Sequence, residues 1–171
     1  MAPQLTPPKL VAVDTNVALD FARRVDDVMD AIETIKRRLP GVEFWLPPTV
    51  VEELAHGASS SPDETTRNAS RLMLRHHHAW GFRLINFVPL GFEQIERIAQ
   101  RLRQQGLLPE AEVHDSMVVT EAAALNCALL TSSDRHVRGI NHQKLAMELG
   151  AFDLIAPLIA TPREIVRKFF R

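Results

Sequence analysis

Cysteine occurs only once in the 171-residue sequence, at position 127, and tyrosine does not occur at all. A single cysteine excludes an internal disulfide framework and a zinc site built from several cysteines, and it fits a reducing, cytoplasmic location. Aromatic residues make up 6% of the chain, so a surface that binds nucleic acid mainly by base stacking is poorly supported. Cys127 adjoins an expected strand, and we interpret it as an inert core residue.

Long apolar runs and a strong excess of charge of either sign are also missing. No run approaches the roughly 18 residues of a membrane span, so we expect no membrane association. The net charge of −1 and pI near 6.7 argue against a protein that coats duplex nucleic acid by charge. An enzyme whose basic residues surround an acidic site remains compatible with this balance. We expect a Pro-rich tail without a signal-peptide core at residues 1–9, then a single domain over residues 10–171.

Short apolar runs alternate with segments of helical periodicity along the whole chain. This alternation predicts an α/β fold with three layers, in which helices cover both faces of a mainly parallel sheet of about five strands. The strands are expected at Leu10–Asp14, Val42–Leu46, Arg83–Val88, Ala128–Thr131 and Phe152–Ile155. The helices are expected at Asn16–Arg23, 25–39, Thr49–Gly57, 63–78, 92–106, Pro109–Leu125 and Lys144–Leu149, and a capping box at Thr161–Glu164 opens a last one.

Two aspartates, Asp14 and Asp134, lie at or just past the ends of apolar runs that are expected to be strands. In open parallel sheets, binding sites form beyond the carboxyl ends of the strands, which is where both side chains would lie. Each aspartate alone has a simpler interpretation, because a carboxylate in this position commonly caps the next helix.

Asp115 is harder to explain as a cap. In a helix it shares a face with Val118, Val119 and Ala122, which we expect to be buried. A charged carboxylate on such a face needs a partner or a metal ion. The simpler alternative is that Asp115 lies in the first helical turn and stays solvated. Glu112 would add a second carboxylate to the same region.

Glu52 and Glu53 lie on an expected helix beside the apolar residues Val50, Val51 and Leu54, so one of the two glutamates must face away from the core. Periodicity alone does not choose between them. Carboxylates that converge without cations repel one another and raise their own pKa values. A hard divalent ion such as Mg²⁺, which prefers oxygen ligands, removes that penalty.

Four segments resemble the motifs of the PIN-domain family, and within it the VapC-like toxin ribonucleases. They run in the family's order, and each contributes one acidic residue. The segments are Val11–Val17 (V-A-V-D-T-N-V), Glu53–Gly57 (E-L-A-H-G), His114–Val119 (H-D-S-M-V-V) and Leu130–Asp134 (L-T-S-S-D).

The resemblance implies a PIN fold and an endoribonuclease that uses Mg²⁺ or Mn²⁺, with an antitoxin partner and a homodimer as further expectations. It selects Glu53 over Glu52, so the implied metal ligands and catalytic residues are Asp14, Glu53, Asp115 and Asp134. Residues expected to orient these carboxylates or the attacking water are Thr15, Asn16, Glu112 and Ser132. The chain is longer than compact toxins of this type, and the extra length falls around Ser59–Trp80.

Several basic residues have weaker interpretations. Arg135, His136 and Arg138 follow Asp134 and are candidates for contacts with RNA phosphates, or else ordinary surface charge. The run His76–His78 invites a metal interpretation, but consecutive helical residues point about 100° apart and do not converge on one ion. His114 as a general base is disfavoured, because metal-bound water needs no histidine.

Three other functions compete with a toxin ribonuclease. A phosphatase that forms an aspartyl-phosphate would need a second aspartate two residues after Asp14, where this chain has Asn16. A PIN fold could also act as a binding module without catalysis, although all four acidic positions are retained. Finally, the same nuclease could serve in RNA processing outside any toxin system, and the sequence does not separate that role from a toxin.

Overall fold

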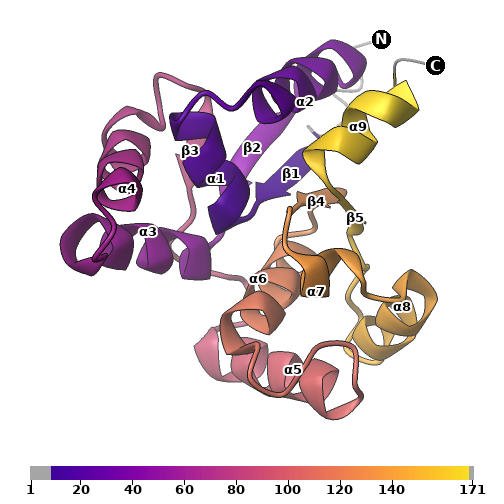
Figure 1. Ribbon diagram of the computed structural model, residues 1–171. Coiled ribbons are helices and arrows are strands. Elements are labelled where there is room, and N and C mark those ends of the chain that lie inside the picture. Colours follow the sequence, from indigo (N-terminus) through magenta and orange to yellow (C-terminus); the bar gives the residue numbers. More distant parts are fainter. Residues whose placement is uncertain (1–8, 170–171) are drawn as a thin grey trace, which may run out of the picture.

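The computed structural model describes residues 9–169, in which five strands and nine helices follow one another along the chain (Figure 1). The strands are β1 (Leu10–Val13), β2 (Glu43–Leu46), β3 (Phe82–Leu84), β4 (Leu129–Thr131) and β5 (Leu158–Ala160). The helices are α1 (Thr15–Ala22), α2 (Asp26–Arg38), α3 (Pro48–Ser60), α4 (Glu64–His76), α5 (Phe92–Gln104), α6 (Val113–Ala124), α7 (Arg135–Arg138), α8 (His142–Gly150) and α9 (Pro162–Phe169). None of the helices within residues 9–169 combines the length and apolar character that a membrane span requires.

The sheet has the strand order β3-β2-β1-β4-β5, and every pair of neighbours is parallel. Strand β1 is central and buried, with Val11, Ala12 and Val13 at 0% exposure. Its register pairs Ala12 with Trp45 of β2 and with Leu130 of β4. A strand that is apolar on both faces needs cover on both faces, which explains why its sequence is a continuous apolar run.

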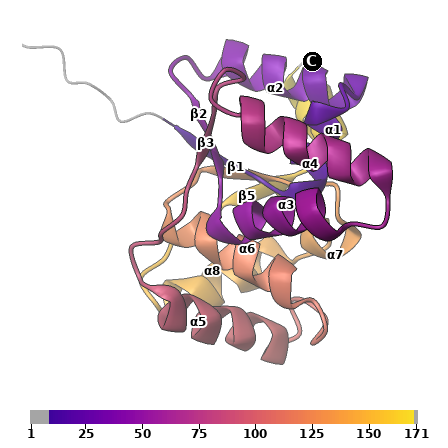
Figure 2. The same cartoon turned by 90° about the vertical axis from the view of Figure 1, so that its left-hand side faces the viewer.

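Helices cover both faces of this sheet, as the sequence predicts. Figure 2 shows α1, α2 and α4 on one side and α5, α6 and α8 on the other. The main hydrophobic core draws residues from the whole described chain, from Val11 to Ile165. Helix α3 packs against α4 and also reaches α6, so it joins the two helical layers at the carboxyl end of the sheet.

Two strands differ from the expected positions. The fifth strand is Leu158–Ala160 and not Phe152–Ile155, because the chain after α8 turns through Asp153, whose φ is +58°. Strand β3 ends at Leu84 and not at Val88. Its neighbour in the sheet, β2, is followed by two prolines that have no N–H group to donate, so the ladder stops there.

Helices α3 and α6 also differ from their expected bounds, and α7 was not expected at all. Helix α3 does not close at Gly57 but continues to Ser60. A Cβ atom at Gly57 would lie 2.7 Å from Ser70 Oγ of α4, so this glycine permits close packing of α3 on α4. Helix α6 starts at Val113 and not at Pro109, because the residues between them form turns. The segment around Ser59–Trp80, where we expect the extra length, contains α4.

The two ends of the domain are described in part. The tail expected at residues 1–9 lies, apart from Lys9, outside the described residues. The expected capping box is confirmed at the start of α9: the Thr161 amide donates to the Glu164 side chain at 2.8 Å, and the Glu164 amide donates to Thr161 Oγ1 at 3.2 Å. The first turn of α9 follows β5 directly.

Candidate metal-binding site at the carboxyl end of the sheet

Asp14 lies where the central strand β1 meets α1, and it is 3% exposed. It caps α1, since its side chain accepts a 2.7 Å hydrogen bond from the Thr15 amide. Its other carboxylate oxygen accepts hydrogen bonds from Ser132 Oγ at 2.5 Å and Asn16 Nδ2 at 3.1 Å. Burial raises the pKa of Asp14, and the hydrogen bonds from Ser132, Thr15 and Asn16 oppose that rise. The carboxylate is therefore held in one orientation.

Ser132 and Asn16 connect this carboxylate to the end of the neighbouring strand β4. The Ser133 amide donates to Asn16 Oδ1 at 2.9 Å, and the Asp134 amide donates to Ser132 Oγ at 3.1 Å. Asp134 caps α7, where one of its oxygens accepts from the His136 amide at 2.6 Å. Both aspartates are thus helix caps, as the simpler interpretation holds, and they also lie at neighbouring strand ends.

Asp115 lies in the first turn of α6, and its pKa is raised to about 7. Burial is the largest cause, followed by the negative charges of Asp134, Asp14, Glu112 and Glu53. Contacts agree with this proximity: His114, the neighbour of Asp115, meets Glu53, and Ser132 links Asp14 to Asp134. The structure therefore brings together the four acidic residues of the sequence motifs, from four separate elements, with Glu112 beside them.

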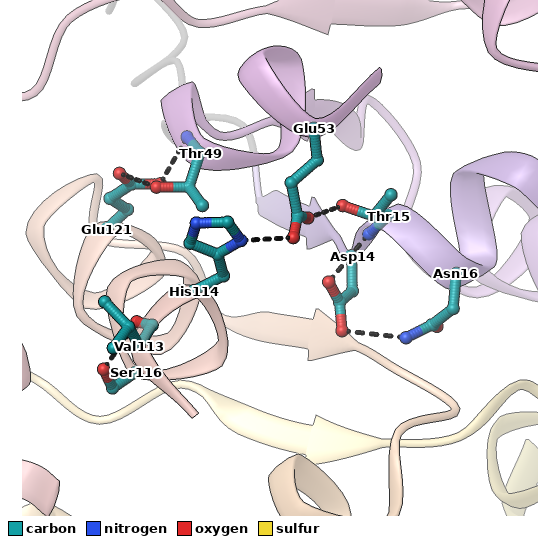
Figure 3. Close-up of polar contacts among 9 residues, drawn as sticks. All are labelled: Asp14, Thr15, Asn16, Thr49, Glu53, Val113, His114, Ser116 and Glu121. Carbon is teal, nitrogen blue, oxygen red and sulfur yellow. Dashed lines mark hydrogen bonds and ion pairs between the residues drawn. The ribbon is translucent and has the colours of Figure 1, made fainter. Parts of the chain in front are cut away.

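Glu53, on α3, points toward the same region from the other side (Figure 3). One of its oxygens accepts a hydrogen bond from the Thr15 hydroxyl. The other lies 2.9 Å from His114 Nδ1. Sequence reasoning assigned His114 no part in the site, whereas the structure places it against Glu53. The neighbouring Glu52 is exposed.

The donor set fits a hard divalent ion in its chemistry. Every candidate ligand is a carboxylate oxygen, and the mutual repulsion that raises the pKa of Asp115 is the penalty that a bound cation would remove. Within residues 9–169, however, the side chains form no group of three or more His, Cys, Asp or Glu already arranged to hold a metal ion.

A pocket of about 540 Å³ adjoins the carboxylates between α1, α3 and α4. It reaches the candidate site at Thr15, Glu53 and His114, and Glu52 and His56 lie farther along its wall. This pocket gives a ligand access to the Glu53 side of the cluster.

The basic residues considered from the sequence have different surroundings. Arg135 and Arg138 are exposed next to Asp134, whereas His136 Nε2 lies 3.5 Å from Glu112. The histidine run is remote from the carboxylates: His77 Nδ1 lies 3.1 Å from the Phe82 carbonyl oxygen at β3. Cys127 is 4% exposed and burial raises its pKa to about 12, as expected of an inert core thiol.

Sequence reasoning missed one buried acid, Glu121 of α6, which is 2% exposed. Its carboxylate accepts hydrogen bonds from the amide and the hydroxyl of Thr49, at 3.0 and 2.7 Å. Burial raises its pKa to about 7, the Thr49 hydrogen bonds oppose the rise, and Glu52 and Glu53 add to it. The only sequence signal is an acid within the small apolar residues of Met117–Ala124.

Asp115 predicts a pH dependence of stability in the absence of metal. Its pKa is about 7 in the folded chain, against an ordinary value of 3.8 for an aspartate, so the folded state binds the proton more tightly than the unfolded chain. Protonated Asp115 therefore makes its full contribution to the free energy of unfolding below about pH 4, and this contribution is lost as the pH rises to about 7. Asp115→Asn removes this titration. We expect the wild type to lose roughly 1–2 kcal/mol more than the variant between pH 5 and pH 8.

Urea denaturation in EDTA at the two pH values measures this difference. The expected loss of stability is smaller than the value calculated from the whole pKa shift, because the Asp115 carboxyl is partly exposed to solvent. Equal losses in wild type and variant would show that Asp115 is not under the repulsion described.

Comparison with known proteins identifies a family and a fold. The family model described as PIN domain matches residues 11–142. A search of curated proteins finds no match. Similar solved structures include VapBC2 from Rickettsia felis bound to a DNA fragment from its promoter, with a TM-score of 0.58 and 16% identity over 89% of this chain and 98% of that chain.

Two further structures are similar. VapBC-1 from nontypeable Haemophilus influenzae has a TM-score of 0.53 and 16% identity over 90% of this chain and 98% of that chain. FitAB bound to an IR36 DNA fragment has a TM-score of 0.50 and 13% identity over 90% of this chain and 95% of that chain. At these identities the likeness shows the fold.

Proposed function

The chain belongs to the PIN-domain family, and from this premise we propose that it is an endoribonuclease that uses Mg²⁺ or Mn²⁺. The proposed ligands and catalytic residues are Asp14, Glu53, Asp115 and Asp134. The observation that carries the proposal is the meeting of these acids: Ser132 links Asp14 to Asp134, and Glu53 contacts both Thr15 and His114, the neighbours of Asp14 and Asp115. Acids gathered in this way are destabilising unless a cation joins them.

A bound divalent ion would lower the pKa of a water molecule and offset the negative charge that develops on the phosphodiester. The chain's own residues supply orientation. Ser132, Asn16 and the Thr15 amide hold Asp14 in place. The Thr15 hydroxyl does the same for Glu53. Because these contacts already hold the carboxylates in place, less conformational entropy would be lost when the carboxylates bind an ion.

Arg135 and Arg138 are the proposed contacts for RNA phosphates, because both are exposed directly beyond Asp134. His136 is a weaker candidate, since it already lies near Glu112. Phosphate contacts position a nucleic acid without reading its sequence, so we expect these arginines to influence RNA affinity and not base preference.

The proposed setting is a type II toxin–antitoxin pair in the cytoplasm, in which the chain is the toxin and acts as a homodimer. The support is the similarity to VapBC and FitAB complexes. The alternative is an RNA-processing nuclease of the same fold. A short reading frame immediately upstream, whose product binds this chain and stops RNA cleavage, would favour the toxin.

The test of the proposal is a gel assay on a pool of structured RNA with Mn²⁺ or with EDTA. We expect wild-type protein to cleave single-stranded regions with Mn²⁺ and to leave the RNA intact with EDTA. Absence of metal-dependent cleavage of any RNA would instead favour a PIN-fold binding module without catalysis.

A further inference from the structure

In the described residues, two polar side-chain contacts join α3 to α6, and only one of them involves a proposed ligand (Figure 3). At one level, His114 of α6 meets Glu53 of α3 at 2.9 Å. At the other, Glu121 of α6 accepts both hydrogen bonds from Thr49 of α3. Thr49 and Glu53 are one turn apart on α3, and His114 and Glu121 are two turns apart on α6. Both pairs of residues therefore lie along the facing sides of the two helices.

The Glu121 contact replaces a missing helix cap. Helix α3 begins after Pro47, which provides no side-chain cap, and Pro48 has no N–H group. The first free backbone donor of the helix is therefore the Thr49 amide, and Glu121 accepts from it at 3.0 Å. A carboxylate at a helix N-terminus is also favoured by the helix dipole. The start of α3 is thus fixed to a buried point on α6.

From this geometry we propose that Glu121 is a positioning residue for the candidate metal site. By holding the N-terminus of α3, it sets the place of Glu53 relative to Asp115, which lies in the first turn of α6. The inference rests on the proposed function, because it assigns Glu121 a part in metal binding. Glu121 itself is not a ligand, since Thr49 occupies its carboxylate.

The test compares two substitutions of Glu121. Glu121→Leu removes both acceptors and leaves the Thr49 donors without partners. Glu121→Gln keeps the shape: its carbonyl oxygen accepts from the Thr49 amide, and its NH₂ group donates to the Thr49 hydroxyl. We expect the Kd for Mn²⁺, measured by calorimetry, to rise about 10-fold in Glu121→Leu, the lower end of the effect of residues that orient ligands. Glu121→Gln should keep about the wild-type Kd.

The two Glu121 variants distinguish positioning of Glu53 from two other roles of Glu121: attraction of the ion by its charge, and stabilisation of the fold alone. If the charge of Glu121 attracted the ion from a distance, Leu and Gln would raise the Kd equally. If Glu121 served stability alone, Glu121→Leu would lower the melting temperature without metal and leave the Kd unchanged below that temperature. Either result overturns the proposal.

A second pair of variants covers the case in which Glu121→Leu does not fold. Thr49→Val removes only the hydroxyl donor, and Thr49→Ser restores it. We expect a weaker Mn²⁺ affinity in Thr49→Val and a near-normal one in Thr49→Ser. Equal affinities in both would overturn the inference. Wild-type protein that binds no Mn²⁺ would overturn the proposed function and this inference together, whereas wild-type binding with an unaffected Glu121→Leu would overturn the inference alone.

Discussion

Replacing Asp115 or Asp14 by asparagine is expected to reduce Mn²⁺-dependent RNA cleavage by at least about 100-fold and to leave the protein folded. The phosphodiester is negatively charged, and its charge increases in the transition state. Carboxylates alone would repel it, so the cations that we propose they hold would supply the positive field. Asparagine preserves the size of the side chain and removes one ligand charge. The initial rate on an end-labelled RNA measures the loss, and circular dichroism checks the fold.

Two variants serve as matched controls for this result. Glu52→Gln changes the exposed neighbour of Glu53 and should keep most activity, whereas Glu53→Gln should lose it. His114→Ala removes a contact of Glu53 but no proposed ligand, so its loss should be smaller than that of Asp115→Asn. Cleavage that survives Asp14→Asn and disappears in His114→Ala would contradict the assignment of the chemistry to the carboxylates.

Millimolar Mn²⁺ or Mg²⁺ is expected to stabilise the folded chain. An ion that binds only the native state contributes about 2.7 kcal/mol at a concentration 100-fold above its Kd. For a domain of this size, that corresponds to a rise in melting temperature of about 5–10 °C. Thermal melts in EDTA and in the presence of metal measure the shift.

Asp115→Asn should change this melting experiment in two directions. Without metal the variant should melt at a higher temperature than wild type at pH 8, because one repelling charge is gone. Added metal should raise the melting temperature of the variant less than that of the wild type, because one proposed ligand has lost its charge. Identical melting temperatures of the wild type in EDTA and in metal would count against cation binding at this cluster.

The fold was largely predictable, because its signals are local. The apolar run at Leu10–Val13 and the helical spacing of the following segments determine which faces are buried. The errors arose where distant residues decide the structure. Strand β5 depends on pairing of Leu129 with Leu158, and the end of β3 depends on the two prolines that follow the neighbouring strand β2. Gly57 resembled a helix end but serves close packing against Ser70.

The candidate site was predictable only in its acidic residues. The motif segments single out Asp14, Glu53, Asp115 and Asp134, and the neighbouring ends of β1 and β4 explain why Asp14 and Asp134 meet. The partners of Glu53 and Glu121 were not predictable. The contact of Thr49 with Glu121 joins residues that are 72 positions apart in the sequence. The periodicity of a single sequence predicts which face of a helix is buried, but it does not predict which residues of two helices meet. Three-dimensional packing alone supplies this information.

The most direct test of the central claim is a crystal structure of the wild-type protein soaked in Mn²⁺, with data collected to detect the anomalous signal of manganese. We expect an anomalous peak at the carboxyl end of β1 and β4, within ligand distance of carboxylate oxygens of Asp14 and Asp115. The same soak of Asp115→Asn crystals should give a weaker peak. A manganese peak elsewhere, or none at this cluster in crystals of protein that cleaves RNA with Mn²⁺, would contradict the account.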